Sequence, residues 1–312
     1  MNPRERGFLL LVSHLGNPER KVLTMAQLRN LAGRIRGMEP PEEERALTAA
    51  DLEALGYGPE MAGRISALLE EEELLERYLL RGRRMDCIPV TRVSGDYPVI
   101  VRRRLGLDSP GCLWVKGDPA LLASPGIALV GSRELRPENG AFAREVGRQA
   151  AAQGLVLVSG NARGADRIAQ EACLEAGGRV VSIVADALER CPAHQRIAYV
   201  SEDGFDLGFS AQRALSRNRV IHALGRMVFV AQARLGRGGT WDGVTRNLRL
   251  GLSSVACFRD GSEAMAELEQ MGAFLVGVED LQDLGALVQS TQNITLPGWE
   301  EAMENTETHL RK

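Results

Sequence analysis

The fold is decided by two stretches of sequence, IALVGSRELRPENG at residues 127–140 and LVLVSGNARGAD at residues 155–166. Each begins with a short apolar run that ends abruptly at Gly or Ser and is followed by a helical segment. This pattern is typical of a buried parallel strand that leads through a loop into a helix. Small residues let a phosphate approach the backbone N–H groups, and the helix N-terminus favours an anion. The two stretches therefore predict a phosphate site at the carboxyl edge of a doubly wound sheet.

Apolar segments of strand length alternate with longer amphipathic segments through most of the chain. Strands are predicted at 127–131, 155–159, 180–184, 227–232, 253–257 and 273–276, and helices at 138–153, 165–177, 211–224, 240–250 and 262–271. Alternation at this spacing favours a parallel sheet with right-handed crossovers. The predicted fold class is therefore α/β, with a doubly wound and mostly parallel sheet.

The chain divides into four predicted regions. Residues 1–86 are helical, and a Gly-containing turn between two of the helices suits a small helix-hairpin-helix or SAM-like domain. Such a domain serves either as a docking or DNA-backbone module or as an inert packing unit, and the sequence leaves both open. Residues 87–124 are predicted as an extended linking region, residues 125–290 as the sheet domain and residues 291–312 as a mobile tail.

Composition places the chain among ordinary globular proteins. Of its 312 residues, 44% are hydrophobic and 25% are charged. No apolar run approaches the roughly 18–20 residues of a membrane span, and no cleavable signal is recognised, so we expect a cytoplasmic protein without a membrane partner. The five cysteines are scattered and form no CxxC pair. We therefore expect neither a disulfide framework nor a metal site, and no cofactor.

Positive charge is concentrated in one segment although the net charge is −3. Between Ala211 and Arg249 there are eight arginines and a single acidic residue, Asp242. A local basic face on an acidic protein is a typical footprint for a polyanion such as nucleic acid. The alternative is that these arginines lie on a solvated helix face.

The candidate binding residues fall in four polar or Gly-rich segments. They are Gly131, Ser132 and Arg133; Ser159, Gly160, Arg163, Gly164 and Asp166; Arg217, Asn218 and Arg219; and Arg237, Gly238, Gly239 and Thr240. The glycines leave the backbone accessible, and an arginine can donate two parallel hydrogen bonds to one phosphate. An amide between two arginines suits a base edge or a sugar as well as a phosphate.

Two of the candidate side chains allow more than one role. Asp166 is predicted either to cap the following helix or to orient an arginine. Trp241 is predicted either to stack against a base, as in single-strand binders, or to lie in the core. No catalytic residues are predicted, because the histidines do not cluster and no carboxylate has a partner at a compelling spacing.

Four features follow one another along the chain: VGSR, VSGxARGxD, RNR and a Gly-rich loop after an apolar strand. In this order they resemble the DprA/Smf family of DNA-processing proteins in the SLOG superfamily. The likeness covers residues 88–260 and includes Tyr97-Pro98 and the segment 114–118. It implies a Rossmann-like fold, frequently preceded by a SAM-like domain. It also implies a homodimer that binds single-stranded DNA in a basic pocket and loads RecA onto incoming strands in natural transformation, without catalysis. On this resemblance, the candidate residues from the first three segments other than Gly131 lie in that pocket.

The chain also departs from the family pattern, and we therefore predict a divergent member. Arg136 and Asn139 stand where the family has Thr and Tyr, Gln170 stands in place of His, and no C-terminal winged helix is recognised. The loop around Gly238-Gly239-Thr240 partly matches the phosphoribohydrolases of the same superfamily, with Asp242 in place of their Glu. The alternative function is therefore a nucleotide-binding sensor or a nucleotide N-glycosidase.

Overall fold

A nine-stranded sheet forms the centre of the molecule, in the strand order β1-β2-β6-β5-β4-β3-β7-β8-β9. The structure, a computed structural model, describes residues 1–37 and 45–292. The strands are β1 Cys87–Thr91, β2 Cys112–Lys116, β3 Gly126–Val130, β4 Val156–Ser159, β5 Arg179–Ile183, β6 Ile197–Ser201, β7 Met227–Val230, β8 Ser254–Phe258 and β9 Phe274–Val276. The strands from β6 to β9 in this order pair in parallel, and β2 is antiparallel to both of its neighbours. This confirms the predicted α/β class.

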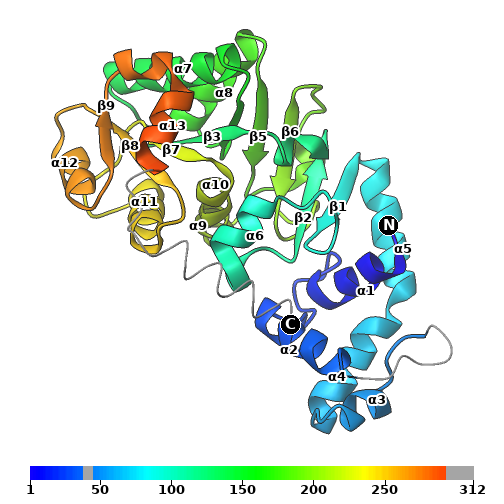
Figure 1. The fold of residues 1–312 in the computed structure, drawn as a ribbon. Coiled ribbons are helices and arrows are strands. Elements are labelled where there is room, and N and C mark those ends of the chain that lie inside the picture. The colour runs from blue at the N-terminus through cyan, green and yellow to red at the C-terminus, as the bar shows by residue number, and fades with distance from the viewer. Residues whose placement is uncertain (38–44, 293–312) are drawn as a thin grey trace.

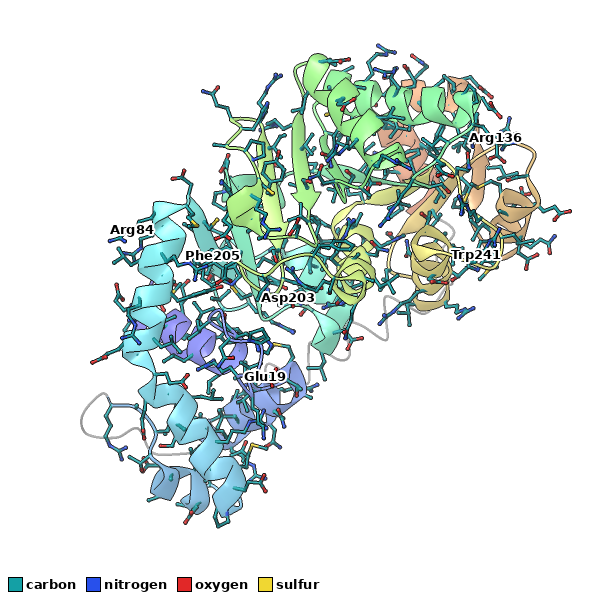
Figure 2. The ribbon with its side chains drawn as sticks, turned by 180° about the vertical axis from the view of Figure 1, so that it is seen from behind. Glu19, Arg84, Arg136, Asp203, Phe205 and Trp241 are labelled. Atoms are coloured by element: carbon teal, nitrogen blue, oxygen red, sulfur yellow. The ribbon has the colours of Figure 1, made fainter. Side chains whose placement is uncertain are left out.

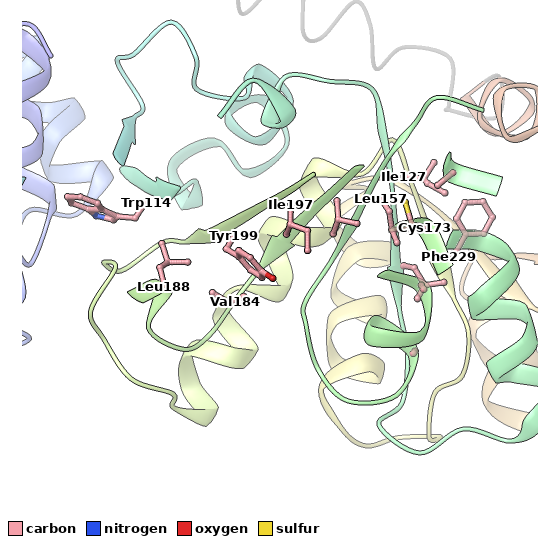
Figure 3. Packing of buried hydrophobic residues seen from close by; sticks show 14 of the residues in the cluster. Trp114, Ile127, Leu157, Cys173, Val184, Leu188, Ile197, Tyr199 and Phe229 are labelled. Atoms are coloured by element: carbon pink, nitrogen blue, oxygen red, sulfur yellow. The ribbon is translucent and has the colours of Figure 1, made fainter. Parts of the chain in front are cut away.

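Helices cover both faces of the sheet (Figure 1). They are α6 Val99–Leu105, α7 Pro137–Ala152, α8 Ala165–Glu175, α9 Ala211–Ser216, α10 Asn218–Leu224, α11 Gly239–Leu250, α12 Glu263–Gln270 and α13 Leu284–Gln292, with short 3-10 helices η1 Gly106–Asp108, η2 Pro119–Leu122, η3 Leu188–Arg190 and η4 Glu279–Gln282. Alternate residues of β3 face opposite sides of the sheet, as the period of a strand requires. Ile127 packs with α7 and α8, whereas Ala128 packs with α6, α10 and α11. Figure 3 shows part of the first of these two cores.

The N-terminal part of the chain is helical, as predicted. Its helices are α1 Pro3–Val12, α2 Met25–Ile35, α3 Ala49–Ala54, α4 Pro59–Glu70 and α5 Glu72–Arg84. The side chains of Thr24 and Thr48 accept hydrogen bonds at the starts of α2 and α3 in capping boxes. Leu31, Leu52 and Ile65 form a small core of their own between these helices.

The structure differs from the prediction in one region, one strand and one helix. Residues 87–124, expected as a linking region, contribute β1, β2 and α6, and β2 pairs with β6, so this region belongs to the sheet. The prediction omitted β6, whose short apolar run carries no period of its own. The single helix expected at 211–224 is two helices, α9 and α10, which meet at Arg217.

The C-terminal region is only partly described. Residues 291–292 of the predicted tail are the end of α13, and residues 293–312 lie outside the described residues. Among the described residues, no helix combines the length and the apolar character needed to cross a membrane.

Candidate nucleic-acid interface

The candidate site is a cleft of about 690 Å³ at the carboxyl edge of the sheet. It lies where β3 has β4 on one side and β7 on the other, so that the loops after these three strands diverge. The start of α10 closes its fourth side. The predicted residues that line it are Gly131, Ser132, Arg133, Arg163, Asp166, Arg217, Asn218, Arg237, Gly238, Gly239 and Thr240.

Four predicted residues do not line the cleft. Ser159 is buried, and its Oγ accepts a hydrogen bond of 2.5 Å from Gln170 Nε2. Arg219 is directed toward η1, because it donates to Glu202 Oε2 at 2.5 Å and to the carbonyl oxygen of Asp108. Gly164 supports the cleft indirectly: it precedes α8 with φ +88°, and a Cβ there would lie 2.5 Å from the Ser132 carbonyl oxygen. The fourth residue that does not line the cleft is Gly160, which leaves room for the Arg217 guanidinium.

Arg217 is a buried cation with unused donors. Only 7% of the residue is exposed, and its Nε and Nη1 have no hydrogen-bond partner among the described residues. The guanidinium lies against Gly160, where a Cβ would stand 1.5 Å from Nη1, so any larger residue would displace it. Burial lowers the pKa of Arg217, but a guanidinium in a protein keeps its proton. Unpaired buried donors are costly, and an anion would satisfy them.

Asp166 braces the loop that carries Gly160. It is buried, and its Oδ2 accepts hydrogen bonds from the backbone N–H groups of Gly160 at 3.1 Å and Ala162 at 3.2 Å. Burial raises the pKa of Asp166, and the nearby charge of Arg217 and the two N–H donors oppose that rise. It makes no side-chain cap of α8 and no ion pair with Arg217. The structure thus gives it a third role, beside the two left open by the sequence.

Positive charge predominates along the cleft, which is lined by five arginines and two acidic residues. Arg133 and Arg237 are exposed and, within the described part of the chain, their side chains make no hydrogen bond or ion pair. Arg163 and Arg234 both approach Glu134, at 3.6 and 3.1 Å. Because these pairs are exposed, they are weak and can be replaced by contacts to a phosphate.

The Gly-rich loop after β7 is held in place by the RNR segment. Asn218 Nδ2 donates to the Gly239 carbonyl oxygen at 3.1 Å, and Gly238 has φ +91° where α11 begins. Asp242, the acidic residue on which a nucleotide-cleaving function depends, is exposed on α11 and does not line the cleft. Among the described residues, no group of three or more His, Cys, Asp or Glu is placed to hold a metal ion.

The apolar side of the cleft was not predicted from the sequence. Phe209 and Leu215 line it, and both side chains are exposed. Trp241, the predicted stacking candidate, does not line the cleft; it is half-buried on α11 and packs against the apolar core (Figure 2). The loop before α9, EDGFDLGFS at residues 202–210, is acidic and follows no predicted strand, so it does not resemble the basic, strand-ending loops by which the cleft was predicted.

Comparisons with known proteins place the chain in a family. The family model described as DNA recombination-mediator protein A matches residues 89–284. The DNA processing protein DprA of Streptococcus pneumoniae is 30% identical over an alignment of 202 positions, which covers 60% of this chain and 66% of that protein. The protein Smf of Escherichia coli is 32% identical over 142 residues, 42% of this chain and 38% of that protein. The aligned part falls short of two thirds of either relative's length.

Two solved structures share the fold. The structure of DprA from Streptococcus pneumoniae covers 90% of this chain and 98% of its own, with a TM-score of 0.68 and 22% identity. That of DNA processing protein A from Helicobacter pylori, which describes a single-stranded DNA binding mode, covers 66% of this chain and 96% of its own, with a TM-score of 0.53 and 23% identity. Since the family model spans more than half of the sequence, the chain belongs to the DNA recombination-mediator protein A family.

Proposed function

We propose that this protein binds single-stranded DNA, with the backbone phosphates in the arginine-lined cleft. The observation that carries the proposal is Arg217, a buried guanidinium whose Nε and Nη1 have no partner within the described part of the chain. Charge-assisted hydrogen bonds to a phosphate oxygen would satisfy both donors. The accessible backbone of Gly131 and Gly239 leaves room for the phosphate to approach.

The spread of charge favours a strand over a mononucleotide. Four further arginines surround Arg217 on the three loops after β3, β4 and β7, and they are more cations than the phosphates of one nucleotide require. Two of them, Arg133 and Arg237, have no competing acidic partner among the described residues. The single-stranded DNA binding described for the Helicobacter pylori protein of the same fold supports this assignment.

Family membership extends the proposal to the wider role. We infer a cytoplasmic homodimer that protects incoming single strands and loads RecA onto them in natural transformation or recombination. No catalytic step is included in this role. The cleft would supply its first event, the capture of the strand.

Binding of a labelled 30-nucleotide oligothymidylate, followed by fluorescence anisotropy over a range of salt concentrations, tests the proposal. We expect tight binding that prefers the single strand over a duplex and weakens steeply with salt, by about 0.7 in log–log slope per neutralised phosphate. Arg217→Ala should lower the affinity roughly ten- to a hundredfold and make the slope shallower, because a charge-assisted contact is lost. Arg226→Ala is the matched control, since Arg226 is exposed between α10 and β7, away from the cleft.

Two outcomes would contradict the proposal. The absence of binding at low salt would exclude a strand-binding cleft. A shallow salt slope, together with tight binding of a mononucleotide or release of its base, would instead support a nucleotide-binding sensor or N-glycosidase.

A further inference from the structure

Phe209 is more exposed than any other large apolar side chain that the structure describes, at 59%. It nevertheless lines the same cleft as the five arginines. A single exposed apolar side chain is ordinary, but Phe209 and the exposed Leu215 together line a cleft rimmed by arginines, and an apolar patch with a polar rim is typical of a ligand-binding groove. A phosphate cannot stack on an aromatic ring, whereas a nucleobase attached to that phosphate can.

The segment that carries Phe209 is fixed on both sides of the ring. On the N-terminal side, Arg213 Nη1 donates to the carbonyl oxygens of Leu207 and Gly208, both at 2.6 Å. On the C-terminal side, Ser210 Oγ accepts from the Arg213 backbone N–H at 3.1 Å and caps α9. These hydrogen bonds fix the backbone on both sides of Phe209, so the fold keeps its side chain exposed.

The same guanidinium ties this segment to the sheet. Arg213 Nε donates to Asp203 Oδ2 at 2.7 Å, and Nη2 donates to Ser201 Oγ, at the end of β6, at 3.0 Å. Nη1 also reaches the Ala185 carbonyl oxygen at 3.0 Å. The segment that carries Phe209 begins near Asp203, which is labelled in Figure 2, and ends at Ser210. Arg213 therefore holds it at both ends, through Asp203 Oδ2 and Ser210 Oγ. Such preorganisation reduces the ordering cost of binding.

We propose that Phe209 is a stacking platform for one nucleobase of the bound strand and that Arg213 positions it. The inference rests on the proposed function and adds to it, because the arginines hold phosphates while Phe209 selects unpaired bases. Bases in a duplex are already stacked on each other and cannot lie on the ring. Stacking on an aromatic side chain changes affinity by roughly five- to a hundredfold per base and accepts any base.

The first experiment measures oligothymidylate binding by Phe209→Ala, Phe209→Trp and the matched control Leu235→Ala. Leu235 is also exposed, at 47%, but does not line the cleft. We expect Phe209→Ala to lose roughly tenfold in affinity with an unchanged salt slope, because no charge is removed. Leu235→Ala should bind as the wild type does. Phe209→Trp should keep the affinity, and its added fluorescence should be quenched by the strand.

A strand of the same length that carries abasic sites separates stacking from phosphate contacts. The wild type and Phe209→Ala should bind this strand equally, because the ring has no base to contact. Arg213→Lys keeps the charge but loses the forked hydrogen bonds that hold the loop. It should weaken binding of oligothymidylate at an unchanged salt slope and leave binding of the abasic strand unaffected.

The outcomes separate the two proposals. If the wild type binds with a steep salt slope and Phe209→Ala binds oligothymidylate equally well, or loses as much affinity for the abasic strand, the stacking platform is excluded and the strand-binding function stands. If the wild type binds no strand at low salt, the proposed function itself fails.

Discussion

His222 is buried beneath the cleft in a polar network that fixes its protonation. The side-chain Oδ1 of Asn247 accepts from the Ser253 backbone N–H at 2.9 Å, so the side-chain Nδ2 of Asn247 is the atom that faces His222 Nδ1, at 3.1 Å. That nitrogen donates, and Nδ1 is therefore the acceptor of a neutral ring. Burial, together with the charge of Arg217, lowers the pKa of His222 to about 4.

This pKa predicts a pH dependence of stability. Between the ordinary value of 6.5 and about 4, the unfolded chain binds a proton at His222 that the folded chain does not. The free energy of unfolding should therefore fall as the pH falls through this window and level off below it, by roughly 3 kcal/mol from this residue. Urea unfolding at pH 7.5, 5.5 and 4.5 should show a smaller loss for His222→Gln than for the wild type.

His194→Gln is the control for this prediction, because His194 is exposed and its ring Nδ1 accepts a hydrogen bond from the Arg196 backbone N–H at 3.1 Å. It should keep the wild-type pH profile. An unchanged profile for His222→Gln would show that the buried ring is not the source of the pH dependence.

Single residues of the cleft were predictable only where a motif marked them. Arg133 and Arg163 follow strand-ending Gly or Ser residues, and parallel strands bring such loops to one edge of the sheet. The RNR segment did not reveal which arginine enters the cleft. A residue and its second neighbour lie on different sides of a helix, so Arg217 faces Gly160 while Arg219 faces Glu202. Phe209 had no marker in the sequence.

Elements with a clear period were predicted better than short or interrupted ones. The break between α9 and α10 carries neither Gly nor Pro, and the backbone at Arg217 has ordinary helical angles, φ −65° and ψ −20°. The break is instead marked by a tightened turn, in which the Val220 N–H donates to the Arg217 carbonyl oxygen at 3.0 Å. The strands at 87–91, 112–116 and 197–201 are as long as β3, but they lie where the regular alternation with long helices is interrupted, by the turn at Asp96-Tyr97-Pro98 and by the 3-10 helices η2 and η3.

The packing of α7 on α8 leads to a prediction at this scale. Gly147 of α7 meets the backbone of α8, where a Cβ would lie 2.1 Å from the Ala169 carbonyl oxygen. Gly147→Ala should force the helices apart and lower the free energy of unfolding by about 1–3 kcal/mol in urea titrations. Gly140→Ala, in the same helix, would meet only Ile168 Cδ1 at 3.8 Å.

The two glycine substitutions should therefore have opposite signs. Gly140→Ala should raise the free energy of unfolding by up to about 1 kcal/mol, because alanine has the higher helix propensity. An equal effect of the two variants would mean that close helix packing does not explain Gly147.

At the scale of the whole molecule, the helical N-terminal part is joined to the sheet through α5. Tyr78 of α5 stacks on Phe205 with ring centroids 4.5 Å apart and meets the edge of Trp114 in β2 at 5.1 Å. Its hydroxyl donates to Asp206 Oδ1 at 2.6 Å. The helical character of residues 1–86 could be predicted, but this shared core with the sheet could not, because it depends on contacts distant in sequence. Phe205 and Asp206 belong to the segment that presents Phe209, so the same junction supports the cleft.

Loss of the Tyr78 ring should therefore weaken both the junction and the coupling between the two parts. Tyr78→Ala should lower the free energy of unfolding by about 3–5 kcal/mol. Tyr78→Phe keeps the ring and should lose about 1–3 kcal/mol, because the hydrogen bond to Asp206 is lost while the ion pair of Asp206 with Arg81 remains. In urea, tryptophan fluorescence and far-UV circular dichroism should give coincident transitions for the wild type and for Tyr78→Phe. For Tyr78→Ala they should separate, because the N-terminal helices lose the aromatic part of the core that they share with the sheet and unfold first. Coincident transitions in Tyr78→Ala at the wild-type midpoint would show that the helices depend on other contacts, and that the segment carrying Phe209 does not need this junction.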